Sequence, residues 1–291
     1  MMIRSVDVLK AGSLTTVQDR GRIGLAQLAV PRSGALDAPA WRLANRLVGN
    51  PEDAAALETT LTGPVLRPRV ACHIAVTGAW SPVLVDGRPG PWGIPIWARP
   101  GQVVKIGTAT RGLRSYIAIS GGLAVDPVLG SRSTDLLSGL GPSPLRDGDL
   151  LPLGTQTGPP AAIDYAPYPP PPTELKLRIV LGPRHDWFTD ATLAAFTQAT
   201  YTVTTYSNRI ALRLEGPPLQ RRHTTELPSE PVVTGAIEVP SDGNPLIFLN
   251  DHPTTAGYPV VAVVAADDLA ACAQARPGTT VRLWVRPAAV R

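Results

Sequence analysis

Residue types that many enzyme signatures require are scarce in this sequence of 291 residues. It contains four histidines and two cysteines, Cys72 and Cys272, too few to predict a zinc site built from these ligands, and we expect no metal centre. Both cysteines lie in apolar surroundings, which indicates buried thiols in a reducing compartment. The sequence has no Gly-Lys-Ser/Thr, no Gly-x-Gly-x-x-Gly after a strand and no Gly-x-Ser-x-Gly. These absences exclude a P-loop, a dinucleotide fingerprint and a nucleophile elbow.

Long apolar runs are also missing. No stretch approaches the roughly 18 consecutive apolar residues of a membrane-spanning helix. The first residues include Arg4 and Asp7 and lack the apolar core of a signal peptide, so we expect a cytoplasmic protein without a membrane segment. The net charge of +4 is small, and no basic run alternates with aromatic residues, so nucleic-acid binding is not expected.

Proline and glycine, in contrast, are abundant, with 32 and 27 residues. This balance is typical of short strands joined by turns and predicts a mainly β protein with few helices. The stretch from Gly158 to Pro172 is rich in proline, which favours a stiff, extended segment outside helices and central strands. We therefore predict a first β domain at 1–157, a proline-rich linker at 158–174 and a second β domain at 175–291.

Four short turn motifs occur in the same order on both sides of this linker. In the first half they are Thr62-Gly63-Pro64, Val76-Thr77-Gly78-Ala79, Asp86-Gly87 and Arg99-Pro100-Gly101. In the second half they are Glu215-Gly216-Pro217, Val233-Thr234-Gly235-Ala236, Asp242-Gly243 and Arg276-Pro277-Gly278. An ordered repeat of this kind indicates an internal duplication and predicts two related β-barrels or sandwiches in tandem.

Three helices are predicted. The first covers residues 38–48, with Asp37 as its N-cap and Gly49 as its stop. The second spans about 190–198. The third begins at Asp267 and ends before Pro277.

A polar cluster at residues 15–22 follows a predicted strand. Gln18, Asp19 and Arg22 bring an amide, a carboxylate and a guanidinium to one loop. Arginine binds a carboxylate or a phosphate through a two-point fork, so this set is typical of an anion-binding loop. The alternative is a turn in which Asp19 accepts backbone amides and the arginines are solvated.

Two further segments carry candidate site residues. Asp251 and His252 follow an apolar strand and offer a carboxylate and an imidazole for proton transfer. Adjacent residues on an extended chain point to opposite sides, so a structural loop is the alternative interpretation. The turn at 130–134, which carries Arg132, is typical either of anion binding through backbone amides or of a plain tight turn.

These segments, taken in order, resemble one bacterial family. The residues that carry the resemblance are 15–22, 33–37, 42–45, 130–134 and 251–259. The family is the C subunit of 5-oxoprolinase, also described as allophanate hydrolase subunit 2 or as the biotin-dependent carboxyltransferase family. It includes an antagonist of a sporulation histidine-kinase inhibitor. The resemblance covers essentially the whole chain.

The resemblance implies cyclophilin-like β-barrels and membership of an ATP-dependent complex that hydrolyses 5-oxo-L-proline to L-glutamate. It also implies the B and A subunits of 5-oxoprolinase as partners, no activity of this chain alone, and ATP bound mainly by a partner. The Met-Lys-Met context of biotin attachment is absent, since the only methionines are Met1 and Met2, so no biotin is expected on this chain. Two alternatives remain. One is a biotin-dependent carboxyltransferase subunit of the urea carboxylase type, and the other is a non-catalytic antagonist that binds a homologue of the kinase inhibitor.

On this basis we assign Asp19, Asp251 and His252 to catalysis. The residues assigned to substrate binding are Gln18, Arg22, Ser33, Arg132, Thr254, Thr255 and Tyr258. The sequence departs from the family pattern at Asn208, where an aspartate is common, and at Ala256, where a glycine is common. These departures call into question a charge at 208 and a left-handed turn at 256.

Overall fold

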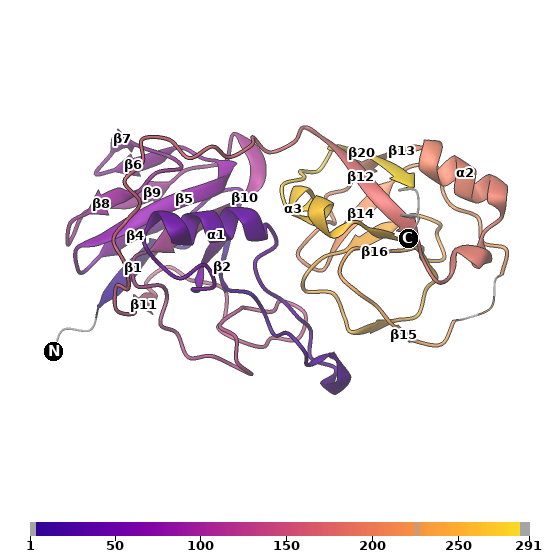
Figure 1. The fold of residues 1–291 in the computed structure, drawn as a ribbon, viewed down its shortest axis with the longest axis horizontal. Coiled ribbons are helices and arrows are strands. Elements are labelled where there is room, and N and C mark those ends of the chain that lie inside the picture. The colour runs from indigo at the N-terminus through magenta and orange to yellow at the C-terminus, as the bar shows by residue number, and fades with distance from the viewer. Residues whose placement is uncertain (1–3, 224, 226, 286–291) are drawn as a thin grey trace. The chain divides into compact units, whose positions relative to one another are not determined.

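The structure is a computed structural model that describes residues 4–223, 225 and 227–285. Its contacts divide the chain into two compact units (Figure 1). Unit 1 comprises the chain up to Ile23, Ser33–Asp135 and Gly139–Pro171, and unit 2 comprises Gly24–Arg32, Leu136–Ser138 and the chain from Pro172 onward. No helix in the described part of the chain combines the length and the apolarity needed to cross a membrane.

Unit 1 contains two antiparallel β-sheets. The six-stranded sheet has the order β11 (Leu150–Pro152), β1 (Ser5–Lys10), β4 (Val65–Pro68), β9 (Val104–Ile106), β6 (Val83–Val85) and β7 (Arg88–Gly90). The five-stranded sheet has the order β2 (Leu14–Gln18), β3 (Ala56–Thr60), β10 (Arg111–Ile119), β5 (Cys72–Trp80) and β8 (Ile96–Ala98).

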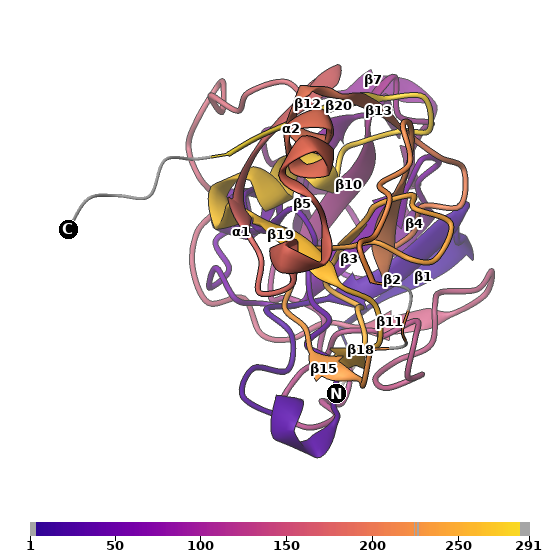
Figure 2. The same cartoon turned by 90° about the vertical axis from the view of Figure 1, so that its right-hand side faces the viewer.

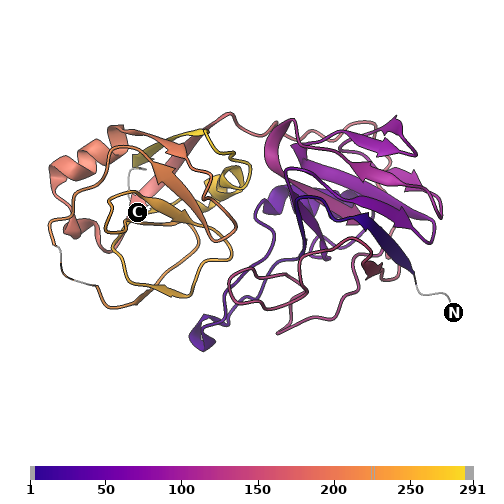
Figure 3. The ribbon, with the colours of Figure 1, turned by 180° about the vertical axis from the view of Figure 1, so that it is seen from behind.

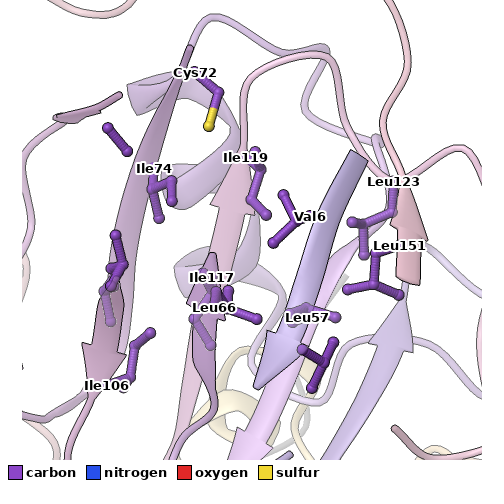
Figure 4. Close-up of a cluster of buried hydrophobic side chains, with 14 of the residues drawn as sticks. Val6, Leu57, Leu66, Cys72, Ile74, Ile106, Ile117, Ile119, Leu123 and Leu151 are labelled. Carbon is purple, nitrogen blue, oxygen red and sulfur yellow. The ribbon is translucent and has the colours of Figure 1, made fainter. Parts of the chain in front are cut away.

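The main core of unit 1 is built from apolar side chains of both sheets. Figure 4 shows Val6, Leu66 and Ile106 from the first sheet beside Leu57 and Ile117 from the second, and all five are fully buried. Burial of one such side chain contributes about 1.5–3 kcal/mol. This repeated apolar burial holds the two sheets together.

Helix α1 (Ala38–Leu47) covers the other face of the five-stranded sheet, against β5 and β10 (Figures 1 and 3). Trp41, Ala44 and Leu47 are buried there beside Tyr116. Because β10 packs against apolar groups on both faces, its burial is nearly continuous and does not alternate.

The predicted N-cap of α1 is confirmed, since the Asp37 carboxylate accepts the Ala40 N–H at 3.0 Å. Both carboxylate oxygens also accept the Tyr168 hydroxyl, at 3.0 Å each. We expect Asp37→Ala to lower the free energy of unfolding by about 2 kcal/mol, because it removes the cap and takes the acceptor away from the partly buried Tyr168 hydroxyl. Urea unfolding monitored by circular dichroism measures this loss. Asp37→Asn, which keeps a capping oxygen, is the control and is expected to lose less.

Unit 2 contains a closed barrel of seven strands. Around the barrel they are β12 (Glu174–Leu181), β19 (Val260–Val264), β16 (Ala236–Glu238), β17 (Leu246–Phe248), β14 (Ala211–Glu215), β13 (Thr200–Val203) and β20 (Thr280–Val285). Helix α2 (Asp190–Gln198) lies beside β20 on the outside of the barrel (Figure 2). Strands β15 (Glu230–Pro231) and β18 (Thr255–Ala256) form a separate two-stranded sheet.

The mainly β class is confirmed, and the barrel closes in unit 2, while unit 1 has two sheets. The helix predicted at 190–198 is confirmed. The third helix is shorter than predicted: a 3₁₀ turn at Ala266–Asp268 leads into α3 (Leu269–Cys272).

The internal repeat of the sequence is also a repeat of backbone turns. Three of the four motif pairs place glycines at similar positive φ angles, which favour glycine. The pairs are Gly78 and Gly235 (81° and 88°), Gly87 and Gly243 (77° and 80°), and Gly101 and Gly278 (83° and 86°).

The proline-rich segment contains no helix or strand and packs against unit 1. The Ala161 N–H donates to the Leu47 carbonyl at 2.9 Å, and the Arg111 Nε–H donates to the Pro171 carbonyl at 2.6 Å. Hydrogen bonds near both of its ends therefore tie this segment to unit 1.

Candidate functional site

Asp19 ties two loops of unit 1 together. Its Oδ1 accepts the Gly21 N–H at 2.8 Å and the hydroxyls of Ser131 and Ser133 at 2.6 Å each. Its Oδ2 accepts the backbone N–H of Arg132 at 2.6 Å. Four donors on one buried carboxylate make Asp19 the point that fixes the loop after β2 against the turn at 130–134.

The other predicted residues of unit 1 lie in the same polar cluster. Gln18 and Ser33 are fully buried, and both donate to the Thr134 carbonyl, at 3.0 and 2.8 Å. Arg22 donates to the Ser133 carbonyl at 2.8 Å, and the side chain of Arg132 donates to a backbone carbonyl at 2.7 Å. The structure thus brings Gln18, Asp19, Arg22, Ser33 and Arg132 together around residues 131–134.

Some buried polar atoms of this cluster, among them one on Gln18 and one on Thr134, have no hydrogen-bond partner among the residues that the structure describes. These two are Oε1 of Gln18 and Oγ1 of Thr134. Leaving such atoms unsatisfied costs about 1–3 kcal/mol each, so they are where a water molecule or a bound ligand can be held. Ser33, which adjoins them through Thr134, has a left-handed backbone (φ 57°), a strained conformation that is common at binding sites. Thr134 was not assigned from the sequence.

Asp251 forms a buried ion pair in unit 2. Its carboxylate accepts the Nε–H and an Nη2–H of Arg209, both at 2.9 Å, and these residues are 0% and 2% exposed. The Leu136 N–H donates to the same carboxylate at 3.2 Å. A buried two-point pair of this kind holds the Asp251 carboxylate in one orientation.

The His252 imidazole contacts other groups than Asp251 does. Its Nδ1 lies 2.6 Å from the Pro253 carbonyl oxygen, and its Nε2 lies 3.2 Å from the Thr234 hydroxyl. A carbonyl only accepts, so Nδ1 carries the proton in the neutral imidazole and Nε2 carries the lone pair. Asp251 and His252 therefore bind different partners, as the geometry of an extended chain leads one to expect.

The remaining predicted residues of unit 2 follow in the same loop. Thr255 is exposed in β18, and the Thr254 carbonyl accepts the Val232 N–H at 3.1 Å. Tyr258 is 43% exposed, and the guanidinium of Arg221 lies 5.3 Å from its ring centre. Its backbone N–H donates to Glu238 at 3.0 Å.

Glu238 was not identified from the sequence, where its only signal is an acid inside the apolar run of β16. It is 3% exposed, and burial raises the pKa of its carboxyl group, against the opposing effects of the Tyr258 N–H and Arg221. A buried carboxyl with a raised pKa beside an exposed tyrosine is a candidate for proton transfer.

Glu238→Gln is expected to stabilise the protein at neutral pH. Because the pKa is raised in the folded state, the contribution of Glu238 to stability is fully present below the ordinary pKa of 4.5 and is lost as the pH rises through the folded-state pKa. Glutamine keeps the acceptor for Tyr258 but does not titrate. Urea unfolding between about pH 4 and pH 8 should therefore show an advantage of the variant that grows with pH. An advantage that is independent of pH would contradict this explanation.

The two departures from the family pattern have structural explanations. The Asn208 side chain accepts the N–H groups of Ile210 and Ala211 at 2.8 and 3.2 Å, a turn-stabilising role that needs an oxygen but no charge. Ala256 lies in β18 opposite Glu230 and does not have a positive φ. Neither position requires the residue that is common in the family.

A second buried polar network supports α1 in unit 1. Oε1 of Glu58 lies 3.7 Å from Nε of Arg114. Oε2 of Glu58 accepts hydrogen bonds from the Tyr116 hydroxyl at 2.8 Å and from the Leu36 N–H at 3.0 Å. Burial raises the pKa of Tyr116 well above its usual value.

In the described part of the chain, no group of three histidine, cysteine or acidic side chains is placed to hold a metal ion.

Comparison with known proteins identifies the family. The sequence profile of "Carboxyltransferase domain, subdomain A and B" matches residues 28–284. The chain is 36% identical to the C subunit of 5-oxoprolinase from Escherichia coli, over 92% of this chain and 86% of that protein. It is 33% identical to urea amidolyase of Lachancea kluyveri, over 95% of this chain but 16% of that protein.

Solved structures agree with this assignment. The crystal structure of TTHA0988 superimposes with a TM-score of 0.88 at 34% identity, and this chain spans 97% of its own length and 56% of that chain. The K. lactis urea amidolyase gives a TM-score of 0.89 at 30% identity, with 99% of this chain and 19% of that one covered. The fold thus also occurs inside longer polypeptides. The resemblance to the C subunit of 5-oxoprolinase is confirmed, and the chain belongs to the carboxyltransferase-domain family.

Proposed function

We propose that this chain is one subunit of an ATP-dependent complex that opens 5-oxo-L-proline to L-glutamate in the cytoplasm, and that it is inactive without the A and B subunits. The observation that supports this proposal most strongly is the 36% identity to the C subunit of E. coli 5-oxoprolinase across 92% of the chain. The relative from Haemophilus influenzae, at 31% identity over 95% of the chain, carries the same name.

The lactam ring of 5-oxoproline is a poor electrophile, because its carbonyl is stabilised by resonance with nitrogen. ATP supplies the phosphoryl group that activates the amide oxygen. Water then attacks the ring carbonyl carbon, the carbon–nitrogen bond breaks, and the nitrogen takes up a proton to become the α-amino group. The phosphoryl group is then on the γ-carboxyl as an acyl phosphate, and a second water releases it as inorganic phosphate to give glutamate. A general base for the water and hydrogen bonds to the substrate are therefore required.

In the proposed arrangement, His252 is the general base, because its Nε2 carries the lone pair and lies beside the Thr234 hydroxyl. Asp19 and Asp251 are positioning residues. Both carboxylates are buried and bound by several donors, and they fix the loops that carry the other groups. The residues proposed to contact the substrate are Gln18, Arg22, Ser33, Arg132, Thr254, Thr255 and Tyr258.

We place the ATP site on a partner protein. The sequence has no Gly-Lys-Ser/Thr phosphate-binding loop, which supports this placement. No biotin attachment is proposed on this chain either.

Reconstitution tests the proposal. The chain is purified together with its A and B partners, and ADP and glutamate formation from 5-oxoproline are measured while each component is omitted in turn. We expect activity only with all components present. A stable complex that does not turn over 5-oxoproline would reject the proposal.

A second candidate function is carboxyl transfer from biotin held on another protein. The similarity to urea amidolyases, at 33% and 31% identity over nearly the whole chain, favours it. Capture of a biotinylated partner on avidin would support this candidate, whereas turnover of 5-oxoproline in the complete absence of biotin would argue against it.

A further inference from the structure

A pocket of about 650 Å³, lined by both polar and apolar groups, opens on the barrel of unit 2. Strand β14, the turn after β13 and the loop before β17 form its walls, and β13 and β14 are paired neighbours in the barrel. Among its lining residues are Thr204, Tyr206, Arg213, Glu215 and Asp242. None of the residues proposed above for the reaction contributes to it.

Two oppositely charged side chains that line this pocket lie on the same face of strand β14. In β14, Arg213 and Glu215 are exposed, whereas Leu214 between them is 2% exposed and points into the barrel. Among the described residues, neither charge has an ion-pair partner, and they do not pair with each other. Other arginines of the same unit are paired, such as Arg178 with Asp268 at 2.6 Å and Arg282 with Glu174 at 3.0 Å. Arg213 and Glu215 are therefore available to a ligand.

The spacing of the two strand positions that carry these charges fits a small dipolar molecule. Residues two apart on a strand are separated by about 6.6–6.8 Å. An ammonium and a carboxylate on the same carbon atom, each at about 2.8 Å from an oppositely charged partner, bridge a similar distance. An α-amino acid carries this pair of groups.

Neighbouring groups complete the pocket. The Thr204 hydroxyl oxygen is buried and has no hydrogen-bond partner in the described part of the chain. The Asp242 carboxylate accepts the Asn244 backbone and side-chain nitrogens at 3.0 and 3.2 Å, which holds it in the wall of the pocket. Tyr206, 78% exposed, provides an aromatic surface at the side.

We propose that this pocket binds a free α-amino acid, with Arg213 holding the α-carboxylate and Glu215 holding the α-ammonium group. Such a site distinguishes glutamate from 5-oxoproline, because the nitrogen of 5-oxoproline is a neutral lactam amide and offers no cation to Glu215. The identification of the ligand with the product of the reaction rests on the proposed function, whereas the site itself does not.

Calorimetric titration of the purified full chain tests this site. We expect saturable binding of L-glutamate, and binding of 5-oxo-L-proline that is at least about tenfold weaker. Arg213→Met and Glu215→Gln should each weaken glutamate binding by about tenfold or more. The control is Arg282→Met, which removes an exposed arginine from another strand of the same barrel and should leave glutamate binding unchanged.

No saturable binding of glutamate would overturn the inference, and so would binding that neither pocket variant weakens or that treats glutamate and 5-oxoproline alike. Glutamate binding that depends on Arg213 and Glu215, in a chain whose reconstituted complex does not open 5-oxoproline, would leave the inference standing and reject the proposed function. A reconstituted complex that opens 5-oxoproline, built from a chain that does not bind glutamate, would support the proposed function and overturn the inference.

Discussion

Replacing His252 with glutamine is expected to lower the turnover of the reconstituted complex by about 10²- to 10⁴-fold, the range typical of a lost general base. The reason is the position of the imidazole, whose Nδ1 donates to the Pro253 carbonyl and whose Nε2 keeps its lone pair beside Thr234. Glutamine can preserve hydrogen bonds at this place but cannot take up a proton at neutral pH. Formation of ADP and glutamate from 5-oxoproline measures the effect.

His185→Gln is the matched control. This histidine belongs to the same unit, is exposed, and places its Nδ1 2.7 Å from the Gly182 carbonyl, but it is not assigned to the reaction. We expect its replacement to leave turnover within about threefold of the wild type. If both variants assemble with their partners and retain similar activity, His252 is not the general base.

Asp251→Ala is expected to lower the free energy of unfolding by about 3–5 kcal/mol, because it removes the carboxylate that binds the buried guanidinium of Arg209 at two points. Arg209→Met should cost a similar amount for the reciprocal reason. The pair is 0% and 2% exposed and is joined by two hydrogen bonds of 2.9 Å, so little solvent is available to compensate for either loss. Urea unfolding of the purified chain measures both effects.

A double variant that removes both charges separates the contribution of the ion pair from the cost of leaving one charge buried. Asp251→Leu combined with Arg209→Met removes both charges, and we expect it to be more stable than either single charge-removing variant. Glu174→Ala, which breaks the exposed pair with Arg282, should cost less than about 1 kcal/mol. Single variants at 209 and 251 that cost no more than Glu174→Ala would show that the buried pair does not stabilise unit 2.

Local features were predictable from the sequence because their causes are local. The start of α1 follows from a capping aspartate, a proline in the first turn and apolar residues on one face, and all of these lie within residues 37–48. The repeated turns were predictable for a similar reason, since each needs a glycine at a left-handed position. The closure of the second barrel was not predictable in this way, because it depends on pairing between strands about one hundred residues apart.

The candidate site shows the same division. The sequence identified Asp19 but left open whether its partners were substrate or backbone, because the serines that bind it are 112 and 114 residues away. Arg209, which forms the ion pair with Asp251, lies 42 residues upstream and was not assigned from the sequence. Thr134 was missed because its hydroxyl is buried without a hydrogen-bond partner in the described part of the chain. Glu238 was missed because burial raises the pKa of its carboxyl group. Only tertiary packing produces these two properties.

The parallel pairing of β12 with β20 has a consequence for synthesis on the ribosome. Glu174 is opposite Thr280 and Ile179 is opposite Val285, so the first strand of the barrel must wait for its last one to be translated. The sheets of unit 1, in contrast, have all of their strands by Pro152. Contacts that are distant in sequence form slowly, and domains made earlier fold earlier. During translation, unit 1 can therefore fold while the apolar strands of the barrel remain unpaired, the period in which a nascent chain depends most on chaperones.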